Sequence, residues 1–314
     1  MTAYLILAAP VVLLIAVAAA PFVMEALRKP MGPDARGRAQ GEIAHLDSGE
    51  THYRWHGPRS DRVIVLVPGL TSPSWIFDAL IGELLRLDYR VLSYDLYGRG
   101  LSDRVAGAQT LDFHARQLGE LLQVLGEKGP VTLLGYSMGG AIATRFAAAE
   151  SDIVDRLVLV APAGMGYRPA ALLTRAARAG IAGSWLWGLL GPAALRRAAA
   201  ADAKKPGGIS DVKARIETEL GRRGYLAAVL SSERNALKES VASDHHEIAA
   251  MYIPTLAIWG EADDTIPISG VGQLASWNRQ AHQEVIAGAD HALIVTEADQ
   301  VAETLRVFLH DVPA

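Results

Sequence analysis

The residues best suited to chemistry lie in the stretch Gly-Tyr-Ser-Met-Gly, which places Ser137 between Gly135 and Gly139. A serine hydroxyl is a weak nucleophile near neutral pH, so it needs a base to take its proton and donors to hold an oxyanion. An apolar run precedes this stretch and an alanine-rich run follows it, which predicts a sharp strand-to-helix turn at Ser137. In that context the pattern predicts a nucleophile. A small-residue turn with an incidental serine is the alternative.

Two candidate acids stand further along the chain, where an apolar run ends. Asp263 and Asp264 follow the segment 253–260, and a glycine before Asp263 and a proline after it favour Asp263. Asp264 is the alternative acid. Either carboxylate could instead cap the next helix.

Three histidines follow these acids, namely His282, His291 and His310. His291 lies after a predicted strand and before the last predicted helix, in a loop suited to carry a base. His282 precedes that strand, at the opposite end of the sheet, and His310 ends the helix, where a solvated cation is the simpler interpretation. We expect His291 to accept the Ser137 proton, and Asp263 to orient the imidazole and stabilise its charged form.

The oxyanion donors are expected to be backbone amides. One is the N–H of Met138, directly after the nucleophile, and the other is the N–H of Leu70, in the loop that follows Pro68-Gly69. Gly69 allows the backbone to turn towards the serine.

Alternating strand and helix patterns must position these residues. Apolar runs predict strands over 51–57, 62–69, 90–98, 130–137, 155–164, 253–263 and 282–291. Helical periodicity or helix-forming residues occupy 110–126, 139–150 and 299–311. The alternation predicts an α/β fold, with a mostly parallel sheet covered by helices on both faces.

The alternation is interrupted once, which suggests an organisation in five parts. Residues 165–248 contain no convincing strand and include Trp185 and Trp187, so we expect a helical lid or cap there. The remaining parts are an N-terminal segment 1–27, a linker 28–41 rich in glycine, proline and arginine, and two core segments, 42–164 and 249–314.

The composition excludes several classes of function. The 314 residues carry a net charge of −4 and no basic block typical of nucleic-acid binding. The chain has no cysteine, which excludes disulfides, a thiol nucleophile and cysteine-ligated metal. His245 and His246 are adjacent, and adjacent residues on a helix point apart, so we do not expect them to bind a metal together. We expect no cofactor.

The N-terminal segment predicts a membrane anchor. Residues 1–24 contain no charged side chain, and roughly 20 apolar residues suffice to span a bilayer. Arg28, Lys29, Arg36 and Arg38 follow the apolar run, which predicts a single-pass anchor with the globular part in the cytoplasm. A cleaved signal peptide, with export of the globular part, is the alternative.

Six motifs in order carry a resemblance to a known family. They are VPGLTSPSW, YDLYGRGLSDR, LLGYSMGG, VLVAPAG, IWGEADDTIP and AGADHAL. Together they resemble the alpha/beta-hydrolase superfamily, most closely its esterase and monoacylglycerol-lipase-like members, over about residues 45–312 apart from the insertion. The resemblance implies an eight-stranded, mostly parallel sheet with a lid after the sixth strand, and some relatives also carry an N-terminal anchor. Relatives commonly have His-Gly where this chain has Pro68-Gly69.

The resemblance implies a serine hydrolase that cleaves carboxylic esters through an acyl-enzyme. An apolar lid and a membrane anchor together favour lipophilic substrates, such as monoacylglycerols or other medium- to long-chain esters. Carbon–carbon bond hydrolases of aromatic ring-cleavage products and cofactor-free haloperoxidases share the same triad and stay open, and a non-catalytic binding protein is a remote alternative. The expected partners are a small ester or lipid and, through the N-terminal helix, a membrane, with no nucleic acid; the oligomeric state stays open.

Overall fold

A single sheet organises the chain in a computed structural model that describes residues 2–37 and 39–311. The sheet has eight strands in the order β1-β2-β4-β3-β5-β6-β7-β8. Their bounds are β1 Glu42–His45, β2 Glu50–His56, β3 Val63–Val67, β4 Arg90–Tyr94, β5 Val131–Tyr136, β6 Val154–Val160, β7 Thr255–Gly260 and β8 His282–Ile286. The first pairings, β1 with β2 and β2 with β4, are antiparallel, and all others are parallel. The predicted mostly parallel, eight-stranded sheet is confirmed.

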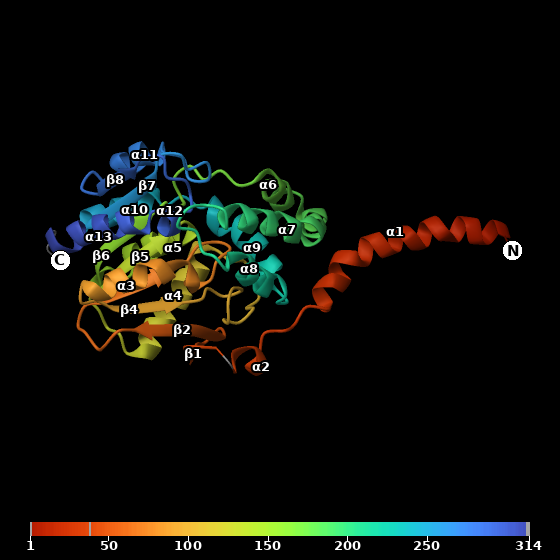
Figure 1. Ribbon diagram of the computed structural model, residues 1–314, viewed down its shortest axis with the longest axis horizontal. Coiled ribbons are helices and arrows are strands. Elements are labelled where there is room, and N and C mark those ends of the chain that lie inside the picture. Colours follow the sequence, from red (N-terminus) through yellow and green to blue (C-terminus); the bar gives the residue numbers. More distant parts are fainter. Residues whose placement is uncertain (1, 38, 312–314) are drawn as a thin grey trace.

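Helices cover both faces of this sheet (Figure 1). One face carries α4 (Leu111–Leu125), α5 (Met138–Ala149), α10 (Ala242–Ala250) and α11 (Gly270–Trp277), whose buried side chains join one apolar cluster with the strands. The other face carries α3 (Asp78–Arg86), α12 (Leu293–Thr296) and α13 (Ala298–Asp311), which share a second cluster. Short helices α2 (Pro33–Arg36), η1 (Ser74–Phe77) and η2 (Ser151–Ile153) lie in connections between these elements.

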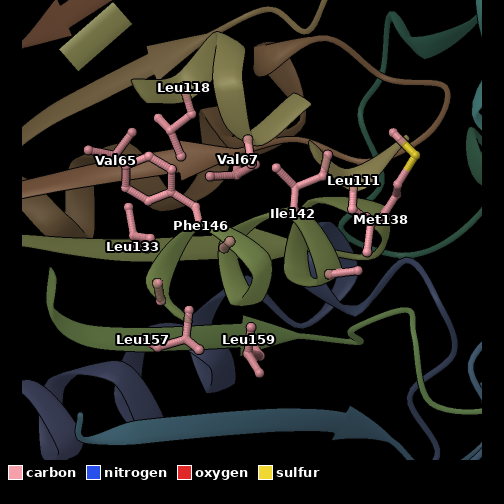
Figure 2. Close-up of a cluster of buried hydrophobic side chains, with 14 of the residues drawn as sticks. Val65, Val67, Leu111, Leu118, Leu133, Met138, Ile142, Phe146, Leu157 and Leu159 are labelled. Atoms are coloured by element: carbon pink, nitrogen blue, oxygen red, sulfur yellow. The ribbon is translucent and has the colours of Figure 1, made fainter. Parts of the chain in front are cut away.

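The core around α5 fixes the turn that carries Ser137. Figure 2 shows Ile142 and Phe146 of α5 among strand side chains such as Leu133 and Leu157. These four side chains are at most 2% exposed. Burying side chains of this size contributes roughly 1.5–3 kcal/mol each, so the start of α5 is held firmly against the ends of the strands.

The parallel strands bring four separate connections to one edge of the sheet. The carboxyl ends of β3, β5, β7 and β8 are Val67, Tyr136, Gly260 and Ile286. Leu70, Ser137, Asp263 and His291 follow these ends within a few residues. Ligands of open α/β sheets bind outside the carboxyl ends of the strands, which makes this edge the place to look for a site.

The connection from β6 to β7 is helical and lies beyond that edge. It contains α6 (Ala171–Arg178), α7 (Gly180–Asp202), α8 (Val212–Leu220), α9 (Tyr225–Arg234), η3 (Ala236–Lys238) and finally α10. Helices α6 to α9 form an apolar cluster of their own, with Trp187 and Tyr225 buried in it. Helix α10 belongs instead to the core, because Ile248 is fully buried in the cluster that contains α5.

The predicted membrane anchor is wrong. Helix α1 (Thr2–Ala26) projects from the rest of the chain in Figure 1, but within residues 2–37 and 39–311 no helix combines the length and the apolar character needed to cross a bilayer. The C-terminal part of α1 packs on the protein itself, because the Trp185 indole donates to the carbonyls of Val17 and Ala18 and Glu25 accepts from the Gly224 amide. Three predictions depended on this anchor and are therefore not supported. They are the single-pass topology, the membrane contact and the cytoplasmic placement.

Candidate active site

Ser137 occupies a strained turn between β5 and α5. Its φ of 56° and ψ of −121° lie in a region that residues other than glycine rarely adopt. Its amide donates to Val160 and its carbonyl accepts from Gly140 and Ala163, which hold the strained backbone in place. The hydroxyl is thereby presented at the edge of the sheet, and the side chain is only 8% exposed.

The two glycines around Ser137 are required by close backbone packing. A Cβ added at Gly135 would lie 2.3 Å from the Gly139 oxygen, and one added at Gly139 would lie 2.0 Å from the Val67 oxygen. Both distances are far below van der Waals contact. The Gly-x-Ser-x-Gly pattern therefore follows from the tightness of the turn.

His291 and Asp263 complete a chain of hydrogen-bonding groups. His291 Nε2 lies 3.0 Å from Ser137 Oγ, and His291 Nδ1 lies 2.8 Å from Asp263 Oδ2. The other oxygen of Asp263 accepts from the amides of Thr265 and Ile266, each at 2.8 Å. The structure thus brings together the three side chains that the sequence predicts.

These distances define what the three groups can do. A carboxylate only accepts hydrogen bonds, so the contact with Asp263 places the proton of neutral His291 on Nδ1. Nε2 is then free to accept the Ser137 proton and to return it later to a leaving group. Asp263 is 5% exposed, so its interaction with a charged imidazole is weakly screened by water.

Tyr136 also positions His291, which the sequence analysis missed. Its hydroxyl donates to the His291 carbonyl at 2.8 Å, and the two rings stack with centroids 5.3 Å apart. Burial raises the pKa of Tyr136, so the phenol keeps its proton and stays a donor. Tyr136 is the first variable position of the Gly-x-Ser-x-Gly pattern, and nothing in the sequence predicts its contact with His291. The contact depends on the folded position of the His291 loop.

The predicted oxyanion donors belong to two segments that meet near Ser137. Met138 is the first residue of α5 and is fully buried, and Leu70 lines the same cavity as Ser137 and His291. A Cβ added at Gly69 would lie 3.3 Å from the Ser137 Cβ, so the loop passes directly beside the serine. Both residues therefore lie beside Ser137, and their amides remain the predicted oxyanion donors.

The alternative residues lie elsewhere. Asp264 is exposed, His282 begins β8 at the opposite end of that strand, and His310 is exposed in the last turn of α13. His245 is fully buried and stacks on Trp277, away from Ser137. In the described part of the chain no three His, Cys, Asp or Glu side chains gather as metal ligands would.

A cavity of about 340 Å³ opens onto Ser137 and His291. The helical connection between β6 and β7 forms much of its wall. Most lining side chains are apolar, including Leu70, Trp75, Tyr167, Leu172, Leu173, Trp187, Leu195, Ile209, Val212, Ile216, Leu237 and Val295. Asp202 is the one charged carboxylate among the lining residues described, and Lys205 pairs with it at 2.8 Å.

Residues 64–304 match the sequence model of the alpha/beta hydrolase family. The chain belongs to the alpha/beta hydrolase family. Among curated relatives of this alpha/beta hydrolase, a putative non-heme chloroperoxidase from Synechocystis is 30% identical over 78% of the chain and 90% of its own length. A 2-hydroxymuconate semialdehyde hydrolase from Pseudomonas is 28% identical over 79% of the chain and 85% of its own length.

Another relative is far longer than this alpha/beta hydrolase. The polyketide synthase ThaQ of Burkholderia thailandensis is 30% identical over 88% of the chain, but the match spans only 13% of the synthase. Among solved structures, the enol-lactonase from Burkholderia xenovorans LB400 has a TM-score of 0.70, covering 85% of this chain and 99% of that chain. Their sequence identity is 23%, so this likeness shows the shared fold alone.

Proposed function

We propose that this alpha/beta hydrolase cleaves carboxylic esters with Ser137 as nucleophile, His291 as general base and acid, and Asp263 as the residue that orients His291. Ser137 Oγ attacks the ester carbonyl while His291 takes its proton, and the amides of Leu70 and Met138 hold the oxyanion. His291 then protonates the departing alcohol, and water hydrolyses the acyl-enzyme by the same steps. The supporting observation is the unbroken contact from Asp263 through His291 to Ser137.

The walls of the cavity favour an uncharged, lipophilic acyl group. No lysine or arginine is found among the described residues that line it, and its one carboxylate, Asp202, is already paired with Lys205. Each buried CH₂ of a substrate contributes about 0.8 kcal/mol, so an alkyl chain gains affinity from these walls. Monoacylglycerols and other medium- or long-chain esters fit this chemistry.

Carbon–carbon bond hydrolysis is the second candidate. It is favoured by the similarity to the 2-hydroxymuconate semialdehyde hydrolase, which extends over 79% of the chain. A substrate of that kind carries a carboxylate, for which a cationic partner in the cavity would be expected. The apolar lining therefore places this candidate second.

A substrate panel decides between the two. The purified protein and Ser137→Ala are assayed with p-nitrophenyl esters and monoacylglycerols of graded chain length, and with 2-hydroxymuconate semialdehyde. We expect kcat/KM to rise with acyl length, and Ser137→Ala to lose both turnover and labelling by a fluorophosphonate. Preferred turnover of the dienoate would favour the second candidate, and full ester turnover by Ser137→Ala would exclude the proposal.

A further inference from the structure

One tight turn after β4 holds both ends of the loop that carries Leu70. The turn begins at Asp95, whose Oδ1 accepts from the Ser74 amide at 2.9 Å and from the Ser74 hydroxyl at 2.7 Å. Four residues later, Arg99 Nε donates to the Leu70 carbonyl at 2.9 Å. The loop from Leu70 to Ser74 is thus fixed at its start by Arg99 and at its end by Asp95.

Arg99 is an unusual residue for such a contact, because it is wholly buried and its acceptors are neutral. Its Nη1 donates to the side-chain oxygen of Gln109, and its Nη2 donates to Ser232 Oγ at 2.9 Å and to the Ala228 carbonyl at 3.4 Å. Among the described residues no carboxylate forms an ion pair with it. Burial lowers the pKa of Arg99 to about 10, so the guanidinium still carries its charge at neutral pH.

Burying an arginine without a carboxylate partner carries a large desolvation cost. This cost indicates that Arg99 has a role other than packing. Ser232 and Ala228 both belong to α9, in the helical connection that covers the cavity. The planar guanidinium therefore spans the distance from that helix to the loop beside Ser137. A lysine could not make these contacts at once, because it lacks the rigid fork of five donors.

A second contact from α9 reaches the same loop. The Tyr225 hydroxyl donates to the Thr71 carbonyl at 2.8 Å, one residue after the carbonyl that Arg99 holds. Tyr225 is fully buried. Two consecutive carbonyls of the loop are thus bound by side chains that belong to α9 or contact it.

We propose that Arg99 is a positioning residue for catalysis, which links helix α9 to the Leu70 carbonyl and so fixes the direction of the Leu70 N–H towards the oxyanion. This inference rests on the proposed function, in which that N–H is a donor. The Leu70 and Thr71 carbonyls follow that N–H in the chain, so their hydrogen bonds to Arg99 and Tyr225 restrict how far the backbone at Leu70 can turn. The arrangement of the cover over the cavity and the geometry of the oxyanion donors are therefore coupled.

The coupling predicts a specific kinetic signature. An oxyanion forms in the transition state and not in the bound ester, so a misdirected amide lowers kcat and leaves KM nearly unchanged. Direct loss of an oxyanion donor costs about 10²–10³ in kcat. Because Arg99 acts through the backbone, we expect a loss of roughly 10- to 100-fold for Arg99→Lys.

The test uses two variants with matched controls. Arg99→Lys is compared with Arg116→Lys, which changes an exposed arginine on α4. Tyr225→Phe is compared with Tyr94→Phe, because the Tyr94 hydroxyl is buried and has no partner. Each variant is assayed for kcat and KM on the best ester, and for its affinity for an alkyl trifluoromethyl ketone, which forms a tetrahedral oxyanion on serine.

The expected result is a fall in kcat and an equal fall in affinity for the ketone in Arg99→Lys, with KM within about twofold of the wild type. Tyr225→Phe is expected to show the same pattern with a loss of a few-fold, and both controls to behave as the wild type. If Arg99→Lys does not fold, as judged by circular dichroism, Tyr225→Phe decides the question. Unchanged kcat in a folded variant, or a loss confined to KM, would overturn the inference.

The same series separates this inference from the proposed function. If the wild type hydrolyses no ester, or Ser137→Ala hydrolyses as fast, the proposed function fails and this inference fails with it. If the wild type is active and depends on Ser137, but the Arg99 and Tyr225 variants are fully active, only the positioning role of Arg99 is excluded.

Discussion

Lys205 Nζ lies 2.7 Å from Asp290 Oδ2, so a residue that follows α7 is paired with the residue directly before His291. The same ammonium group contacts Asp202, which lines the cavity. Burial acts to raise the pKa of Asp290, but hydrogen bonds from Lys205 and the Ala292 amide outweigh it and lower that pKa. The helical connection over the cavity therefore touches the loop that bears the candidate base.

Lys205→Met is expected to weaken this contact and to reduce ester turnover by a few-fold. The pair is partly exposed, and ion pairs of this kind contribute about 0–1 kcal/mol to stability. Salt screens them, so the difference in turnover between the wild type and Lys205→Met should shrink at high salt. Because the folded-state pKa of Asp290 is depressed, the stabilisation is present above its ordinary pKa and is lost as the pH falls through the lowered value. Equal stability curves against pH for the wild type and Lys205→Met, measured by urea unfolding, would contradict this role; Lys213→Met is the exposed control.

Asp263→Asn should preserve the fold and remove most of the activity. An asparagine can present its NH₂ group to His291 Nδ1, which favours the imidazole tautomer that carries its proton on Nε2. Such an imidazole cannot accept the Ser137 proton, and in serine proteases the corresponding change lowers kcat by about 10⁴. The measurement is kcat at pH 7 and at pH 9, with Asp264→Asn as the matched control. A loss in Asp264→Asn as large as that in Asp263→Asn would point to the wrong acid.

His245 is expected to make the protein sensitive to acid. Burial lowers the pKa of His245 from its ordinary 6.5 to about 4, and neither ring nitrogen has a partner. Because the folded-state pKa is lowered, stability is unaffected above about pH 6.5 and falls as the pH drops towards 4. Each pH unit in that range costs about 1.4 kcal/mol, which gives a loss of about 3 kcal/mol by pH 4.

His245→Phe should therefore flatten the fall in stability between pH 6.5 and 4 and retain the stacking on Trp277. Urea unfolding followed by tryptophan fluorescence at several pH values measures the difference. His246→Phe serves as the control, since that neighbouring side chain is exposed. If the two variants showed the same pH dependence, burial of His245 would not be the cause.

Ala194→Phe tests whether the acyl chain enters the cavity between α7 and the sheet. Ala194 lines the cavity, whereas its neighbour Ala193 is exposed and does not. A phenyl group at 194 would occupy space needed by a long chain, so kcat/KM for long esters should fall at least tenfold and that for acetate esters should change little. Ala193→Phe should keep the wild-type preference for chain length. A uniform loss across all chain lengths would place the acyl group elsewhere.

The order of residues along the chain was enough to place the candidate residues at one edge of the sheet, for a physical reason. Ser137, Asp263 and His291 each follow a parallel strand within a few residues, and the ends of parallel strands meet in space, so their order along the chain is enough to bring them together. The strand β1 was not predicted, because four residues with one buried side chain carry little periodicity.

Other features depended on contacts between distant segments. The lack of charged side chains in residues 1–24 suggested a membrane span, but no described helix has the length and apolar character to cross a bilayer. The contacts of Trp185 and Gly224 with the C-terminal part of α1 could not be predicted from composition either. Arg99 belongs to a motif that supported only the family resemblance, and its partners in α9 are 129 and 133 residues away along the chain. Such contacts follow from the tertiary fold and leave no local pattern.

The helical connection between β6 and β7 also divides the site within the chain. Leu70 and Ser137 lie before it, and Asp263 and His291 lie after it, yet β6 and β7 are neighbours that pair in parallel. A chain cut at the exposed Lys204 would yield two fragments, neither of which holds a complete site, and the paired strands would have to reunite them. If the protein hydrolyses esters as proposed, hydrolysis by the mixed fragments would report their association.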